Sequence, residues 1–263
     1  RYGRIFTDIT YDCWTWEYKA QAFLFLYPDL FGYDPAQKDP ELFALSRNTY
    51  LAQKEDYFSY AAGRQMGYGQ GYITESAILM DDPVDMQGYV EQAAAFCYHH
   101  SDHNYIVPEG VIMHPSGRFW FRNCDLGNCV QQAEIVKCAR LLIGIDDLNP
   151  DRGLSLIPRL PKDWTEINVQ DYPVVAQANN GTERSMVSYT YQKTAAGLNF
   201  KMKTARPIKL NTLRIGPIPE GKSIKTKGKI PSSKIVKRYG QAFVYFDLSG
   251  QPADHVEVSV LLD

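Results

Sequence analysis

The stretch that decides the fold covers residues 119–164 and reads FWFRNCDLGNCVQQAEIVKCARLLIGIDDLNPDRGLSLIPRLPKDW. A polar loop at residues 122–128 comes first, and a segment with a broad apolar face, typical of a buried helix, follows it. A proline-rich crossing at residues 156–161 comes last. The chain has helical patterns before this crossing and strand patterns after it. We therefore predict two domains, residues 1–150 and residues 151–263.

Helical patterns fill the first part of the chain. Asp39-Pro40 and Asp82-Pro83 each place an N-cap aspartate before a proline at the first helical position. Residues 66–72 contain three glycines and are expected to form a loop, although they lack the spacing of a dinucleotide site. The pattern predicts helices at residues 14–26, 40–62, 74–80, 84–98 and 127–143.

The last of these helices should bury its apolar residues. These are Val130, Ala133, Val136, Cys138, Leu141 and Leu142.

Strand patterns fill the second part. Residues 198–203 alternate strictly between apolar and polar side chains, as a half-buried strand does. Strand-like segments that recur at intervals with turn residues between them predict an antiparallel β-sandwich. The other segments are residues 187–191, 210–215, 223–227, 242–248 and 256–262.

Charge is divided unevenly, although the net charge is only −2. Residues 1–150 hold 11 Lys and Arg against 20 Asp and Glu, and residues 151–263 hold 17 against 10. Residues 201–238 carry 12 of these basic residues and the single acid Glu220, which raises the alternative of nucleic-acid binding. Because the lysines fall on alternating strand positions, we interpret them as a solvated sheet face. We expect neither a nucleic-acid partner nor a membrane partner.

Cysteine and histidine spacing predicts no metal and no cofactor. The five cysteines show no CxxC pair and lie among apolar residues, which favours reduced thiols over disulfides. His99, His100 and His103 follow a predicted helix end, where a histidine complements the helix dipole. Zinc proteases instead need two histidines four residues apart on a helix.

The proline-rich crossing and the order of the two parts resemble a known superfamily. Leu156-Ile157-Pro158-Arg159-Leu160-Pro161-Lys162-Asp163-Trp164 is similar to the Leu-Leu-Pro-x-Leu-Pro-x-x-Trp segment of bacterial α-L-fucosidases, which are six-hairpin glycosidases. Asp125-Leu126-Gly127-Asn128-Cys129 resembles their Asp-Gly-Asn-Phe-Gly loop, with Leu126 in place of glycine and Cys129 in place of phenylalanine. Residues 14–21 resemble, less closely, the Trp-Thr-Gly-Asp-Ala-Gln helix of α-L-rhamnosidases.

This resemblance implies an (α/α)6 toroid of helical hairpins followed by a β domain. Residues 1–150 would be the helical-hairpin catalytic region, and residues 151–263 would be the C-terminal β-sandwich. The helices expected above are too few to close such a ring. Since the chain opens at Arg1-Tyr2-Gly3 without a methionine or a signal peptide, we expect the missing hairpins to precede Arg1 in a longer protein.

Glycosidases commonly use two carboxylates, which lie about 6.5–9.5 Å apart in inverting enzymes such as toroid glycosidases. The resemblance places Asp125 where the fucosidases have an aspartate that helps to activate water. Glu109 lies in a loop between apolar residues that would raise its pKa, and Glu75 follows the glycine-rich segment. These three acids are the candidate catalytic residues. The alternative is structural: Asp125 caps the next helix, Glu109 lies in a surface turn and Glu75 interacts with a helix dipole.

Aromatic, amide and cationic residues near these acids would bind the sugar. The candidates are Trp14, Trp16, Glu17, Tyr72, His114, Arg118, Trp120, Arg122, Asn123 and Asn128.

These features, together with the resemblance, predict a glycoside hydrolase, an inverting two-carboxylate enzyme acting on a plant or bacterial glycan. The resemblance alone implies a rhamnoside or a fucoside as the substrate. Two alternatives stay open. One is a phosphorylase or a lyase on the same fold, and Arg118 and Arg122 would suit a phosphate. The other is a non-catalytic carbohydrate-binding or structural protein.

Overall fold

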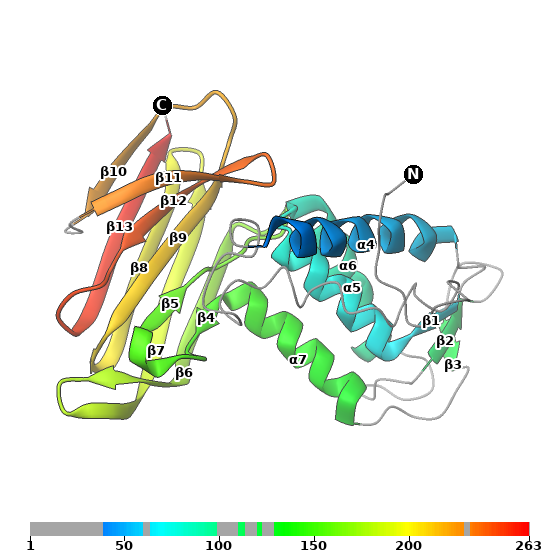
Figure 1. The fold of residues 1–263 in the computed structure, drawn as a ribbon, viewed down its shortest axis with the longest axis horizontal. Helices are drawn as coiled ribbons and strands as arrows, with labels where there is room; N and C mark the ends of the chain where they lie inside the picture. Colours follow the sequence, from blue (N-terminus) through cyan, green and yellow to red (C-terminus); the bar gives the residue numbers. More distant parts are fainter. Residues whose placement is uncertain are drawn as a thin grey trace. The chain divides into compact units, whose positions relative to one another are not determined.

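The computed structural model describes residues 39–59, 64–98, 110–113, 120–122, 129–228 and 232–262. The chain divides into two compact units, Arg1–Ala139 and Arg140–Asp263, which we call the helical unit and the β unit. The division falls inside helix α7 (Cys129–Ile143). Figure 1 shows helices α4 to α7 at the start of the described chain and two sheets at its end.

Two helices of the helical unit begin as the sequence predicts. Helix α4 (Pro40–Ser59) has Asp39 as its N-cap, because Asp39 Oδ1 accepts a hydrogen bond of 3.2 Å from the N–H of Leu42. Helix α6 (Pro83–Tyr98) has Asp82 in the same place, with Oδ1 accepting the N–H of Val84 at 2.9 Å. The predicted N-caps are confirmed.

The prediction of a loop at residues 66–72 is wrong. Residues 67–72 belong to helix α5 (Gly67–Leu79), which follows strand β1 (Arg64–Met66) directly. Glycine costs a helix about 1 kcal/mol relative to alanine. Here burial offsets that cost, because Ile73, Ala77 and Ile78 of the same helix are completely buried.

The segment between the helices predicted at residues 84–98 and 127–143 also contains strands. Strand β2 (Gly110–Met113) pairs with β1 on one side and with β3 (Trp120–Arg122) on the other, both antiparallel. The order is β1-β2-β3. Strands of three or four residues are too short for a periodic pattern to be visible in the sequence.

The expectation of a helical-hairpin toroid is wrong for the part of the chain that the structure describes. That part holds four helices followed by two five-stranded sheets, so strands predominate. The physical reason lies in the motif that suggested the toroid. The Leu156 to Trp164 crossing is hydrogen-bonded to the end of one helix, and it carries no information about how many helical hairpins precede it.

The β unit consists of two sheets. Strands β4 (Ile145–Asp146), β5 (Leu154–Leu156), β9 (Leu210–Ile218), β11 (Ser232–Arg238) and β12 (Gln241–Asp247) form one, in the order β11-β12-β9-β5-β4. Strands β6 (Glu166–Ala178), β7 (Gly181–Thr194), β8 (Gly197–Ile208), β10 (Ile224–Gly228) and β13 (Ala253–Leu262) form the other, in the order β10-β13-β8-β7-β6.

The pairing departs from a purely antiparallel arrangement at one place. Strand β5 runs parallel to β9, whereas the other paired strands of both sheets are antiparallel. A short 3₁₀ helix (η3, Pro150–Arg152) turns the chain between β4 and β5.

One hydrophobic core joins the two sheets. Leu213 of β9 and Val244 of β12 come from one sheet, and Tyr191 of β7, Phe200 of β8 and Val260 of β13 come from the other. The hydroxyl of Tyr191 stays in this core because it bonds both to the N–H and to the carbonyl of Gly216, at 3.2 and 3.1 Å. Burial raises the pKa of Tyr191 to about 12, so the ring remains a neutral donor and acceptor.

The proline-rich crossing caps helix α7. An α-helix leaves its last four carbonyl groups without a partner inside the helix. Buried Arg159 supplies two of the missing donors: Nη1 bonds the carbonyl of Leu141 at 2.8 Å, and the backbone N–H bonds the carbonyl of Leu142 at 2.9 Å. Its positive charge also suits the negative end of the helix dipole.

The remaining carbonyls at this helix end are also bonded. The N–H of Gly144 bonds the carbonyl of Arg140 at 2.9 Å, and the hydroxyl of Tyr189 donates to the carbonyl of Ile143. The carbonyl of Gly144 then accepts the N–H of Ile157 at 2.7 Å. We call residues 144 and 156–161 the joint, because they fix the end of α7 to the first strands of the β unit.

The apolar face predicted for α7 is correct only in part. Cys138 and Leu142 are buried, whereas Ala133 is exposed and Val136 is 69% exposed. Cys138 forms no disulfide, as predicted for the cysteines, and its thiol donates to the carbonyl oxygen of Gly71 on α5 at 3.7 Å.

Candidate functional site

Glu75 is the catalytic candidate that the structure describes. It lies in the middle of α5 between Thr74 and Ser76, and it is only 1% exposed. A carboxyl group held this far from water is costly to ionise unless polar groups surround it. Glu75 lies in the body of α5 and not in its first turn, so the structure does not place it at the helix N-terminus that the structural alternative assumed.

Three binding candidates are placed by their backbones alone. Tyr72 lies on α5, three residues before Glu75. Trp120 and Arg122 lie on β3, where they pair with Met113 and Val111 of β2. Two of these residues therefore share a small sheet, and the third lies one turn from the buried acid.

The other sequence-predicted site residues lie outside the described residues. They are Trp14, Trp16, Glu17, Glu109, His114, Arg118, Asn123, Asp125 and Asn128.

A polar cluster that the sequence did not predict ties α4 to α6. Asp85 Oδ2 accepts hydrogen bonds from Tyr50 Oη at 2.7 Å and from Lys54 Nζ at 2.6 Å. Burial is the larger cause, and the facing Asp85 carboxylate the second, of a pKa of Tyr50 well above its usual range. Tyr50 therefore remains a donor at every physiological pH, and the cluster fixes the two helices to each other.

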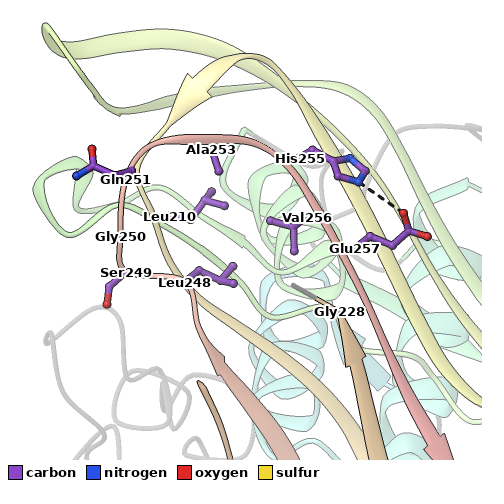
Figure 2. Close-up of a pocket in the computed structure, with 10 residues that line it drawn as sticks. All are labelled: Leu210, Gly228, Leu248, Ser249, Gly250, Gln251, Ala253, His255, Val256 and Glu257. Carbon is purple, nitrogen blue, oxygen red and sulfur yellow. Dashed lines mark ion pairs between the residues drawn. The ribbon is translucent and has the colours of Figure 1, made fainter. Parts of the chain in front are cut away.

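The β unit has a hollow of about 590 Å³ between the loop that follows β12 and strand β13, which we call the end hollow. Figure 2 shows its apolar side chains, Leu210, Leu248, Ala253 and Val256, gathered together. His255 and Glu257 project from β13 away from them, and His255 Nε2 lies 3.5 Å from Glu257 Oε2. Glu257 is the single acid among the described lining residues, so these residues offer no carboxylate pair for hydrolysis.

The loop that closes the end hollow gives a pH-dependent prediction. Asp247 Oδ1 accepts the N–H of Ser249 at 2.9 Å as well as its hydroxyl, and these bonds lower the pKa of Asp247. We expect Ser249→Ala to raise this pKa, measured by carbon NMR titration of the carboxyl group. Ser223→Ala, a change of an exposed serine elsewhere in the unit, is the control and should leave it unchanged.

The sign of the effect on stability follows by linkage. Because the pKa of Asp247 is lower in the folded than in the unfolded state, the stability that this carboxylate contributes is fully present above the unfolded pKa. It disappears as the pH falls through the folded pKa. The Ser249→Ala protein should therefore lose less stability than the wild type on acidification, and an equal loss would contradict the assigned hydrogen bonds.

A second hollow, of about 530 Å³, lies on the sheet β10-β13-β8-β7-β6, and we call it the face hollow. The sequence analysis did not find this hollow, because a single sequence does not show which strands lie side by side. Its signal was present in the sequence, as pairs of polar residues two positions apart in three separate strands. These pairs are Asn168 and Gln170, Ser188 and Thr190, and Lys201 and Lys203.

Comparison of this chain with family models, with curated proteins and with solved structures gives no match. None of the described helices is long and apolar enough to cross a membrane. The function therefore has to be argued from the residues and from the geometry of the two units.

Proposed function

We propose that this chain is part of a glycoside hydrolase whose catalytic carboxylates come from the helical unit. The observation that supports the proposal best is the joint. The residues that resemble the crossing of six-hairpin glycosidases cap a helix and lead into strands, which is the structural context that this motif has in that superfamily. The proposal needs no complete toroid in this chain, since it concerns the chemistry of the acids alone.

Glu75 is the proposed general acid, because burial disfavours the charged form of a carboxyl group. Asp125 is the proposed base, which would activate water on the opposite face of the sugar. The proposed substrate is a plant or bacterial glycan, and a rhamnoside or a fucoside is the first choice. The reaction would invert the anomeric centre.

The test is an assay on aryl α-L-rhamnosides and α-L-fucosides, with any natural segment that precedes Arg1 included. We expect Asp125→Asn to lower kcat at least about a hundredfold, as loss of a general base does. Asp254→Asn, an equal change at an exposed aspartate of β13, should leave kcat unchanged. The anomer released first, observed by proton NMR, reports inversion or retention.

The other outcomes also decide between functions. Unchanged turnover by the Asp125→Asn variant would refute the assignment of the base. Turnover that requires inorganic phosphate would indicate a phosphorylase, and an unsaturated product absorbing in the ultraviolet would indicate a lyase. Binding of the glycan without turnover by the wild-type protein would indicate a non-catalytic binding protein.

A further inference from the structure

The face hollow is built by outward-pointing side chains of four neighbouring strands. Thr190 of β7 pairs with Lys201 of β8, and Lys201 pairs with Glu257 of β13. The next row of outward residues along the strands consists of Ser188, Lys203 and His255. Side chains of neighbouring strands in one row lie about 5 Å apart.

A β-bulge shapes one wall of this hollow. The register of β6 against β7 shifts between Val169 and Tyr172, and Asp171 has a φ of 50°. The N–H of Asp171 bonds the hydroxyl oxygen of Ser188 at 2.9 Å, and that hydroxyl contacts Asp171 Oδ1 at 3.2 Å. The wall is therefore held in place by the protein itself, without a ligand. Bulges commonly redirect side chains in this way at binding sites.

Charge is distributed unequally along the hollow. Lys203 is exposed and has no acidic partner among the described residues. Lys201 contacts Glu257 at 3.6 Å, but the two side chains are 66% and 59% exposed, so this ion pair is weak and easily exchanged. The lysines thus lie toward β13, whereas the acid Asp171 lies at the opposite side, on β6.

The neutral lining consists of amide and hydroxyl groups. Asn168, Gln170 and Thr190 have no side-chain hydrogen-bond partner among the described residues. Amides and hydroxyls both donate and accept hydrogen bonds, as the hydroxyl groups of a sugar do. The Tyr189 ring is buried on the inner side of the sheet and is not available for stacking on a ligand.

We propose that the face hollow binds a sugar residue that carries a carboxylate, as in an acidic polysaccharide. The carboxylate bonds Lys203 and Lys201, and the sugar hydroxyls bond Asn168, Gln170 and Asp171. A volume of about 530 Å³ is within the usual range for small-molecule sites. Without an aromatic platform, the charge of the ligand has to supply much of the affinity. The site stands whether or not the chain is a hydrolase, since its residues belong to the β unit alone.

The test is a titration of the full chain with trigalacturonate, followed by calorimetry and by NMR of the backbone amides. We expect saturable binding with shifts at residues 168–171, 188–190 and 201–203. Lys203→Ala should weaken binding about tenfold, as loss of a hydrogen bond between charged groups does. Lys222→Ala, the same charge change at an exposed position outside the hollow, should leave binding unchanged.

Three further binding experiments distinguish this proposal from a site that recognises charge alone. Asn168→Ala, which alters an exposed neutral side chain, should weaken binding several-fold and tests the sugar contacts independently of charge. Neutral galactotriose should bind at least about tenfold more weakly than trigalacturonate. Sodium acetate at the same concentration should not displace the acidic sugar, because a simple carboxylate lacks the hydroxyl contacts.

The proposal is overturned by any of four results. These are no binding of trigalacturonate, equal binding of the neutral sugar, equal weakening by Lys203→Ala and Lys222→Ala, or displacement by acetate. The readout is binding and not turnover, so failure here is distinguishable from failure of the proposed hydrolase activity.

Discussion

Arg159→Ala should lower the free energy of unfolding of the β unit by about 3 kcal/mol. The guanidinium group is buried and donates to the carbonyls of Leu141 and Ile157 at 2.8 and 3.2 Å. Removing it leaves the carbonyl of Leu141 at the end of α7 and the carbonyl of Ile157 in the crossing without this donor. It also leaves a cavity where the side-chain stem packed. The midpoint of urea unfolding, followed by circular dichroism, measures the loss.

A matched control separates this capping from a general effect of charge. Lys162→Ala removes a positive charge from an exposed position three residues further along the same segment, and we expect a change within about 0.5 kcal/mol. Equal unfolding midpoints for the two variants would refute the capping role of Arg159. The proline-rich crossing would then serve only as a connection.

The fold could be predicted from the sequence where local chemistry determines it. Asp39 and Asp82 were recognised as N-caps because an aspartate before a proline leaves few other structures open. The alternation of residues 198–203 was recognisable as a strand for the same local reason, and these residues lie in β8. In each case the decisive interaction is made within a few residues.

The rest depends on contacts between residues far apart in the sequence. Burial of Ile73 and Ile78 holds α5 helical through three glycines, and no local pattern reports that burial. The parallel pairing of β5 with β9 joins segments more than fifty residues apart. The toroid was inferred from the Leu156 to Trp164 crossing, the loop at residues 125–129 and residues 14–21, and of these only the crossing lies wholly within the described residues. A motif that describes the end of one helix was therefore used to predict the arrangement of a whole domain.

The candidate site shows the same division. Glu75 could be named from its surroundings in the sequence, but its burial inside α5 came from the packing of helices. Lys201 and Lys203 were interpreted as part of a solvated sheet face, and their exposure on β8 agrees with that. The hollow beside them depends on the bulge of β6 near Asp171, which the sequence does not mark.

Gly144→Ala should destabilise the β unit more than any other substitution considered, by about 4 kcal/mol. Gly144 ends α7 with a φ of +64°, and a Cβ atom there would lie 1.9 Å from the carbonyl oxygen of Ile157. That oxygen belongs to the backbone of the joint and accepts a hydrogen bond from Arg159. It can move away only if the crossing separates from the helix end.

Gly221→Ala provides the control that isolates the steric contribution. Gly221 has a similar φ of +76°, but a Cβ atom there would meet nothing within 4 Å. Its substitution should therefore cost only the left-handed backbone conformation, about 1 kcal/mol. The difference between the two unfolding free energies measures how tightly the crossing lies against the end of α7. If both alanines cost the same, the close approach of Ile157 is refuted, and the joint is a looser connection than its hydrogen bonds indicate.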